Sequence, residues 1–238
     1  MAWSRAIVFR SFQQNLVRRL SQARLARQVI IDSFHRLWYE APGTWTKNRY
    51  LGYAVSQLPL DLWLYQEIIY DERPAYVLQT GVWAGGSLLY FAHLLDLIGA
   101  PPSAIVIGVD LKLSAEAKTL VHPRIRLIEG DSTAQSTLAE IDKLIPAPHG
   151  LVSLDSDHYY GHVLRELSRY HRFVGVGTHM VVEDTNVNGH PVVPDFGPGP
   201  YEAVDEFLRA HPEFESDEAL WERNLISFHR HGWLRRIG

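Results

Sequence analysis

From residue 75 onward, five short apolar runs alternate with helical segments, and this alternation constrains the fold more than any other feature of the chain. Val, Ile and Leu fill consecutive positions of each run, as expected for strands buried on both faces of a parallel sheet. The repeated order of strand and helix predicts a doubly wound α/β domain. The predicted strands are Ala75 to Leu78, Ala104 to Val109, Ile125 to Ile128, Leu151 to Leu154 and Met180 to Val182. The predicted helices between them are Ser87 to Ile98, Ser132 to Ile145 and Tyr159 to His171.

The two ends of this region follow other patterns. A helix is predicted from Asp61 to Tyr70, before the first strand, and another from Tyr201 to Ala210, after a loop rich in Gly and Pro. Two strand-like runs come last, Leu225 to His229 and Trp233 to Ile237. Because only Arg230-His231-Gly232 separates them, we expect an antiparallel hairpin that closes the sheet.

The N-terminal segment has its own character. Apolar residues recur at intervals of three and four from Ile7 to Leu37, which predicts an amphipathic helix, and the first 30 residues carry six arginines and no acid. Such a helix fits a membrane surface or a partner helix, and equally an ordinary solvated helix or a contact between subunits. We expect residues 1–49 to form a helical extension and residues 50–238 the main domain, in a chain that forms a homo-oligomer.

Composition excludes several classes of protein. After residue 30 the chain has 17 basic and 27 acidic residues, a balance that argues against nucleic-acid binding. The chain has no cysteine, so disulfides and thiolate catalysis are excluded. No apolar run approaches the roughly 18 residues of a membrane-spanning helix, and the start does not resemble a secretory signal. We therefore expect a cytoplasmic protein without a transmembrane segment, with peripheral membrane contact through the basic helix as the remaining alternative.

The first predicted strand ends in a glycine-rich turn, Gln79 to Ser87, that leads into a helix. Gly81, Gly85 and Gly86 would let the backbone pass close to a ligand, and the helix N-terminus would offer free N–H groups to an anion. The same turn could serve only to pack strand against helix. Its spacing does not match the G-x-G-x-x-G pattern of dinucleotide-binding proteins.

Acidic residues follow the second and third predicted strands. Asp110 is placed to accept hydrogen bonds from the two hydroxyls of a ribose, although it could equally cap the next helix. Asp131 could face an adenine amino group or cap the helix predicted to begin at Ser132. Together with the glycine turn, these residues outline a nucleoside pocket with an anionic tail.

Three carboxylates follow the fourth and fifth predicted strands. Asp155 ends one strand, and Glu183 and Asp184 end the next. Because neighbouring parallel strands end side by side, these side chains can converge, and three carboxylates repel one another unless a cation neutralises them. Oxygen ligands suit magnesium or another hard divalent ion. The alternative is that one acid caps a helix while the others face water.

Polar residues near these acids are further candidates. His158, three residues after Asp155, could accept a proton from a substrate hydroxyl, or could be an ordinary surface histidine. Substrate hydroxyls could also bind the polar side chains of Asn186, Asn188 and His190. The Pro- and Gly-rich loop that follows could form a lid, although turn formation alone would explain its composition.

The motifs as a whole resemble the cephalosporin hydroxylase family, a group of methyltransferases that includes rhamnosyl O-methyltransferases. The resemblance covers nearly everything from Tyr50 to Ile237. It is carried by Asp61-Leu62-Trp63-Leu64-Tyr65-Gln66-Glu67, Thr80-Gly81 to Gly85-Gly86-Ser87, Asp155-Ser156-Asp157-His158, Val181-Val182-Glu183-Asp184-Thr185-Asn186-Val187-Asn188-Gly189-His190-Pro191 and Pro194-Asp195-Phe196-Gly197-Pro198-Gly199-Pro200.

The resemblance implies a Rossmann-like class I methyltransferase sheet and transfer of a methyl group from S-adenosylmethionine to a sugar hydroxyl of a glycoside or glycolipid, with Mg²⁺ as a second cofactor. It implies that Asp155, Glu183 and Asp184 hold the metal, with His158 as the general base beside Asp155. The residues expected around the methyl donor are Gln79, Thr80, Gly81, Gly85, Ser87, Asp110, Asp131 and Asp155. Gln79 departs from the family, which usually has glutamate there, so the charge that would attract the methionine ammonium is missing.

Two other functions stay open at this point. A nicotinamide-dependent oxidoreductase or hydroxylase could use the same sheet, although the missing G-x-G-x-x-G pattern counts against it. A non-catalytic assembly protein could keep the nucleoside pocket and dock a partner through the arginine-rich helix. The four chemically capable side chains at the ends of the fourth and fifth strands weigh against that second alternative.

Overall fold

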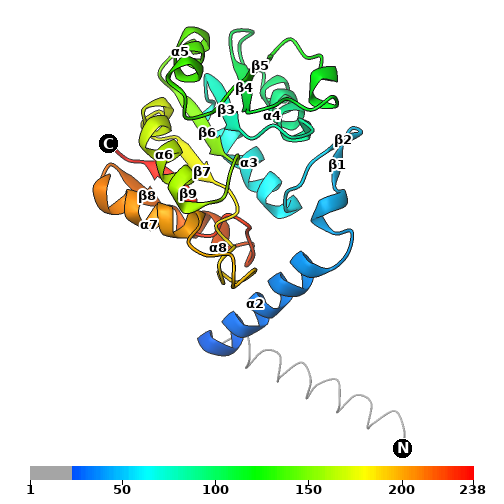
Figure 1. The fold of residues 1–238 in the computed structure, drawn as a ribbon, viewed down its shortest axis with the longest axis vertical. Helices are drawn as coiled ribbons and strands as arrows, with labels where there is room; N and C mark the ends of the chain where they lie inside the picture. The colour runs from blue at the N-terminus through cyan, green and yellow to red at the C-terminus, as the bar shows by residue number, and fades with distance from the viewer. Residues whose placement is uncertain (1–22) are drawn as a thin grey trace, which may run out of the picture. The chain divides into compact units, whose positions relative to one another are not determined.

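A computed structural model describes residues 23–238 of the chain (Figure 1). The chain divides into two compact units, residues 1–41 and residues 42–238, a boundary eight residues before the one expected from the sequence. In the first unit the described residues form α2 (Arg24–Glu40), and the part of the predicted N-terminal helix before residue 23 lies outside the described residues.

The second unit contains all the strands of the described chain and its remaining helices. The strands are β1 (Arg49–Tyr50), β2 (Tyr53–Ala54), β3 (Tyr76–Thr80), β4 (Ile105–Asp110), β5 (Ile125–Glu129), β6 (Gly150–Leu154), β7 (His179–Val182), β8 (Phe214–Ser216) and β9 (Trp233–Arg236). The α-helices are α3 (Pro59–Glu72), α4 (Gly86–Leu97), α5 (Gln135–Leu144), α6 (Tyr160–Tyr170), α7 (Pro200–Ala210) and α8 (Glu218–Glu222). Short 3-10 turns lie at η1 (Trp45–Lys47), η2 (Ala117–Thr119) and η3 (His171–Phe173).

Seven strands form the main sheet in the order β5-β4-β3-β6-β7-β9-β8. The first five are parallel, which confirms the doubly wound prediction, and β9 runs antiparallel to both β7 and β8. Because β3, β6 and β7 are buried at every position, their side chains pack on both faces of the sheet.

Helices cover both faces of this sheet and make two apolar cores (Figure 1). One core joins the strands to α5, α6 and α7 through side chains such as Leu138, Leu167 and Phe207. The other joins them to α3 and α4 through side chains such as Leu64 and Leu88. This layering leaves the carboxyl ends of β3, β4, β5, β6 and β7 as the edge at which loops gather.

The closing antiparallel pair is confirmed, but one of its predicted strands is wrong. The strand paired with β9 is β8, and the run from Leu225 to His229 forms a loop. The backbone of that run makes other bonds: the Phe228 N–H donates to Asp61 Oδ2 (2.8 Å), and the Phe228 carbonyl accepts the Asn186 N–H (3.0 Å). Leu225 is exposed, but the residues from Ile226 to His229 are buried, because they contact the segment that follows β7 rather than a strand.

Candidate active site

The candidate site lies at the carboxyl ends of β6 and β7, which are neighbouring parallel strands. The Asp155 N–H donates to the carbonyl of Thr80 at the end of β3 (3.1 Å), and the Glu183 N–H donates to the carbonyl of Leu154 at the end of β6 (3.0 Å). These bonds continue the sheet one residue beyond each strand. The backbones of the acids that follow the two strands are therefore aligned at the same edge of the sheet.

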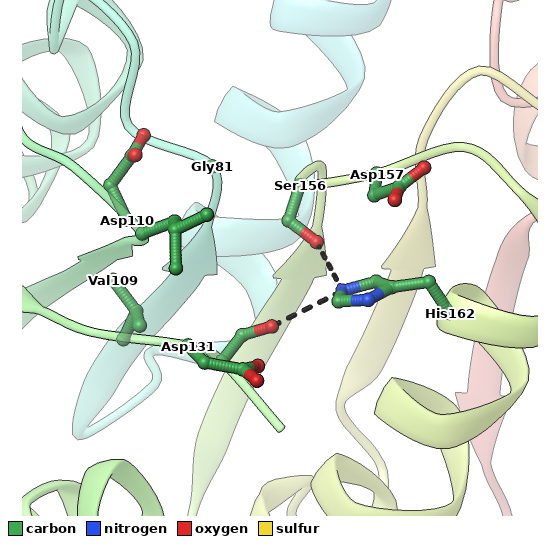
Figure 2. Close-up of a pocket in the computed structure, with 9 residues that line it drawn as sticks. Gly81, Val109, Asp110, Asp131, Ser156, Asp157 and His162 are labelled. Carbon is green, nitrogen blue, oxygen red and sulfur yellow. Dashed lines mark hydrogen bonds between the residues drawn. The ribbon is translucent and has the colours of Figure 1, made fainter. Parts of the chain in front are cut away.

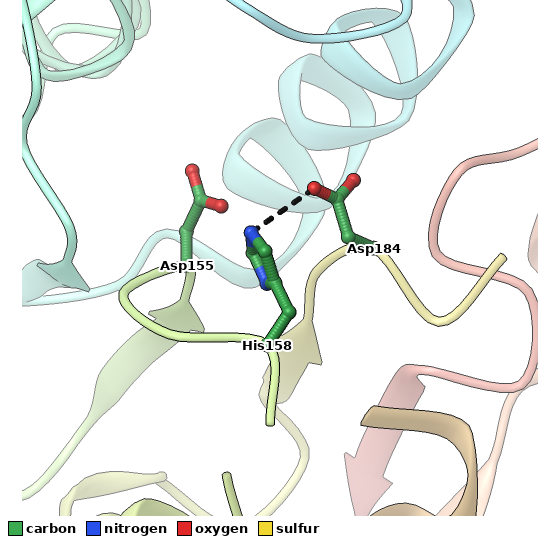
Figure 3. Close-up of side chains that lie close together, drawn as sticks. All are labelled: Asp155, His158 and Asp184. Atoms are coloured by element: carbon green, nitrogen blue, oxygen red, sulfur yellow. Dashed lines mark ion pairs between the residues drawn. The ribbon is translucent and has the colours of Figure 1, made fainter. Parts of the chain in front are cut away.

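Three side chains come together at this edge, those of Asp155, His158 and Asp184. Each offers one ligand atom, and the three atoms lie within 4.8 Å of one another. His158 Nε2 is 3.2 Å from Asp184 Oδ2, and Figure 3 shows the imidazole between the two carboxylates. All three residues are partly exposed, so a ligand can reach them.

Glu183, the third acid expected in the metal site, lies next to this group but is more deeply buried, and its charge helps to raise the pKa of Asp155. Its side chain is 1% exposed, and its carboxylate accepts hydrogen bonds from the Tyr65 hydroxyl (2.7 Å), Ser153 Oγ (2.6 Å) and Gln57 Nε2 (2.6 Å). These donors satisfy both carboxylate oxygens inside the protein. The structure thus brings Asp155 and Asp184 together with His158, while Glu183 is buried next to Asp155, and its part in metal binding stays a prediction.

The charge and chemistry of the three-residue group fit a hard divalent cation. Burial, together with the carboxylates of Glu183 and Asp184, raises the pKa of Asp155 well above its usual range. A cation bound by carboxylate oxygens would relieve this repulsion, and such oxygens are the ligands that Mg²⁺ prefers. The group has one imidazole and the chain has no cysteine, which is a poor ligand set for zinc.

The glycine turn after β3 passes directly against the loop that carries Asp155. Gly81 has φ +76°, and a Cβ built on it would lie 1.9 Å from the carbonyl oxygen of Asp155. Only glycine combines this backbone conformation with so close an approach. The turn predicted from the sequence therefore serves the site, because it places the end of β3 beside the end of β6.

Replacing Gly81 with alanine is expected to lower the free energy of unfolding by about 2 kcal/mol or more, because strain and steric overlap act together. Gly99→Ala is the matched control, since Gly99 also has positive φ (+66°) but has no atom within 4 Å of the added Cβ. That control is expected to lose about 1 kcal/mol. Denaturant unfolding measures both values, and equal losses would contradict the close approach.

A cavity of about 280 Å³ lies beside this turn. Figure 2 shows Gly81, Asp110 and Asp131 on one side of it and Asp157 and His162 on the other. The cavity thus lies at the ends of β3, β4, β5 and β6, where a doubly wound sheet binds its ligand. Because Asp157 lies between Asp155 and His158 in the chain, the three-residue group and the cavity share one loop.

The two acids predicted to contact a nucleoside both line the cavity, and both already accept local hydrogen bonds. Asp110 Oδ2 accepts the N–H groups of Val82 (2.8 Å) and Trp83 (3.1 Å), so it shapes the glycine turn. Asp131 Oδ1 accepts both the N–H (2.7 Å) and the hydroxyl (2.8 Å) of Thr133. Neither acid caps a helix: the first helical turn after Asp110 begins only at Ala117, and α5, after Asp131, begins only at Gln135.

The side chain of Gln79 shows whether the glycine turn has a hydrogen-bond acceptor available for the ammonium group of a methyl donor. Its Nε2 donates to the carbonyl of Gly81 (2.8 Å), whereas its Oε1 is buried and has no hydrogen-bond partner in the described structure. A buried unpaired acceptor at this place fits a donor supplied by a ligand. Three other residues predicted to contact the cofactor lie at the two ends of the glycine turn: Thr80 ends β3, Gly85 precedes α4, and Ser87 lies in the first turn of α4.

The residues predicted to bind substrate hydroxyls hold the loop between β7 and α7. Asn188 Nδ2 and His190 Nε2 are each 2.9 Å from Oε1 of Glu202, in the first turn of α7. Asn186 is fully buried, and its carbonyl accepts the Val192 N–H (3.0 Å). Their role in substrate binding stays a prediction.

The contribution of α6 to the cavity wall was not predicted from the sequence. His162 Nε2 lies 3.0 Å from Ser156 Oγ and 3.3 Å from Ser132 Oγ (Figure 2). A hydrogen bond to the buried carboxylate of Glu166 raises the pKa of His162 above its usual value. The available signal was the spacing of four residues between His162 and Glu166, which puts both on one face of a helix that follows a site strand.

Comparison with solved structures shows a Rossmann-like methyltransferase fold. CmcI bound to Mg and SAM superposes with a TM-score of 0.63 at 20% identity, covering 85% of this chain and 84% of that one. The O-methyltransferase from Bacillus cereus in complex with SAH superposes with a TM-score of 0.51 at 14% identity, covering 66% of this chain and 72% of that one.

The sequence comparisons define the family. The family described as Rhamnosyl O-methyltransferase/CmcI matches residues 42–237, and the chain belongs to this family. The rhamnosyl O-methyltransferase of Mycobacterium leprae is 35% identical over 210 residues, covering 87% of this chain and 90% of that protein. The rhamnosyl O-methyltransferase of Mycobacterium tuberculosis H37Rv is 33% identical over 207 residues, covering 86% and 81%. The resemblance seen in the sequence motifs is confirmed.

Proposed function

We propose that the protein is an O-methyltransferase that uses S-adenosylmethionine and Mg²⁺ to methylate a sugar hydroxyl of a glycoside or glycolipid. The observation that carries the proposal is the group formed by Asp155, His158 and Asp184 beside the cavity at the glycine turn. Membership of the rhamnosyl O-methyltransferase/CmcI family supports both the reaction and the class of acceptor. A nicotinamide-dependent reaction has no comparable support.

Each side chain of the group has a separate part in this proposal. Asp155 and Asp184 hold the cation. The residues that line the cavity, among them Gly81 and His162, hold the methyl donor. When bound, the cation lowers the pKa of a nearby hydroxyl, and S-adenosylmethionine supplies an electrophilic methyl group. Glu183 stays a candidate third ligand: its buried carboxylate, held by Gln57, Tyr65 and Ser153, lies next to Asp155.

His158 is the general base in this proposal. It takes the proton of the acceptor hydroxyl at Nε2, and the Asp184 carboxylate 3.2 Å away stabilises the imidazolium that results. Because methyl transfer requires the oxygen, the methyl carbon and the sulfur to align, the rigid strand ends that carry the site would contribute through positioning.

Removing divalent metal tests the proposal directly. EDTA is expected to abolish methyl transfer, and Mg²⁺ in excess of the chelator to restore it, because the oxygen ligands alone cannot activate the hydroxyl. The assay follows a labelled methyl group from S-adenosylmethionine to a panel of rhamnosides and other glycosides by mass spectrometry. Full activity in EDTA, with metal content below the protein concentration, would show that the metal assignment is wrong.

The proposal also covers the oligomeric state of the protein and its location in the cell. Among the helices formed by residues 23–238, none has the length and apolar character that crossing a membrane requires. We propose a homo-oligomer that works in the cytoplasm, with the basic N-terminal segment as a candidate for subunit or peripheral membrane contact. Light scattering of the full chain, and flotation with anionic lipid vesicles, test the two contacts separately.

A further inference from the structure

The backbone of Asp184 adopts a conformation that its surroundings must hold in place. Its φ angle is +54°, in the left-handed region that non-glycine residues rarely occupy. At this turn the carboxylate of Asp184 enters the three-residue group, whereas that of the preceding residue, Glu183, is buried. Whatever fixes the peptide group before Asp184 therefore also fixes the direction of its carboxylate.

His229 makes that contact. Its Nδ1 accepts the N–H of Asp184 at 3.1 Å, and its side chain is completely buried. An imidazole nitrogen that accepts a peptide N–H carries no proton, so the hydrogen of a neutral ring resides on Nε2. The contact joins two loops that lie 45 residues apart in the sequence, and it is a single hydrogen bond of defined direction.

The surroundings of His229 hold the ring where it is. Its Nε2 lies 3.6 Å from Glu183 Oε2 and 3.7 Å from Asp61 Oδ2, distances too long for hydrogen bonds but short enough for electrostatic attraction. Asp61 also fixes the backbone of this loop, since its Oδ2 accepts the N–H of Phe228 at 2.8 Å. The rings of Tyr65 and Trp233 lie close to the imidazole, with centroids 6.4 and 5.6 Å away.

We propose that His229 is a positioning residue that fixes the carboxylate of Asp184 for cation binding. The inference rests on the proposed function, because it assigns a cation to the group that contains Asp184. His229 itself is too deeply buried to touch a substrate, so it acts only through the Asp184 peptide. The buried acids Asp61 and Glu183 keep the ring oriented, which explains why ionisable side chains occur in this part of the core.

Mn²⁺ binding to the full chain, measured by electron paramagnetic resonance without methyl donor or acceptor, tests the proposal. In His229→Asn the side-chain oxygen can take the place of Nδ1, whereas in His229→Gln the amide lies one bond further out. We expect His229→Asn to bind Mn²⁺ within about threefold of the wild type. His229→Gln should bind about tenfold more weakly or worse, as for other residues that orient a metal ligand.

His179, a buried histidine at the start of β7, provides the control, because β7 is the strand that leads to Asp184. His179 begins β7, is 4% exposed and pairs with Glu72 and Asp217, so His179→Asn perturbs the core without touching Asp184. It should leave Mn²⁺ affinity unchanged. If His229→Gln does not fold, His229→Leu removes the acceptor without burying a new polar group and should show the same loss of affinity.

The outcomes separate this inference from the proposed function. Wild-type affinity in folded His229→Gln or His229→Leu would overturn the role of His229 while leaving the cation site in place. A similar loss in His179→Asn would reduce the effect to general destabilisation and would also overturn it. No Mn²⁺ binding by the wild type would instead contradict the proposed function itself.

Discussion

Asp155→Ala is expected to lower kcat for methyl transfer by about a hundredfold or more, because it removes one of the two carboxylates assigned to the cation. The folded protein should lose no stability. Burial and the neighbouring carboxylates already raise the pKa of Asp155 well above its usual range, so the residue sits where its charge is unfavourable. A loss of activity together with an unchanged or raised Tm would be the signature of a residue kept for function.

Asp142→Ala is the control for this experiment. Asp142 lies on α5 and forms an exposed ion pair with Arg172 (2.8 Å), away from the candidate site. Its removal should leave kcat unchanged and alter stability by at most about 1 kcal/mol. Near-normal turnover by folded Asp155→Ala would show that this carboxylate has no part in the reaction.

His158→Gln is expected to lower kcat by about a hundredfold to ten-thousandfold, the usual range for loss of a general base. Glutamine keeps a polar side chain near Asp184 but cannot take up a proton. Binding of S-adenosylhomocysteine should be unchanged, because His158 lies outside the cavity wall. Steady-state kinetics and calorimetric titration measure the two effects independently.

His211 gives a matched histidine for comparison. It is partly exposed and pairs with Glu213 at 2.8 Å, much as His158 pairs with Asp184, but it lies at the end of α7. His211→Gln should retain full activity. If His158→Gln also retained it, another group would have to accept the proton, and the assignment of His158 would fail.

The central sheet was predictable because its strands have an unambiguous environment. Buried parallel strands need apolar side chains on both faces, so Leu151 to Leu154 and Met180 to Val182 stand out as continuous apolar runs. The polar residue after each run then marks the carboxyl end of a strand. The sequence therefore indicated which edge of the sheet carries the site, and the position of the glycine turn in it.

The run from Leu225 to His229 shows where this reasoning fails. Ile226 and Phe228 are buried as expected, whereas Leu225 is exposed. The hydrogen bonds of Phe228 with Asp61 and Asn186 replace those of a strand. Asp61 and Phe228 are 167 residues apart, so no local pattern could reveal the contact. Composition predicts burial, whereas the partners of the backbone decide between strand and loop.

The two acids after β7 show a second limit of prediction from sequence, which concerns the environment of individual side chains. Glu183 and Asp184 are adjacent in sequence and chemically alike, and both were expected in one metal site. The left-handed turn at Asp184 and the donors around Glu183 give the two carboxylates different surroundings, one partly exposed and one buried. Neither feature has a sequence signature, because the turn occurs at a residue other than glycine and the donors come from distant segments.

A crystal grown with Mn²⁺ and S-adenosylhomocysteine would show whether Asp155 and Asp184 hold a cation, because anomalous scattering locates the ion without reference to activity. We expect one strong Mn²⁺ peak, with carboxylate oxygens of Asp155 and Asp184 within coordinating distance of it. The nucleoside should lie in the cavity between Gly81 and His162. An ion bound elsewhere, or no ion while the nucleoside is in place, would contradict the proposed cation site.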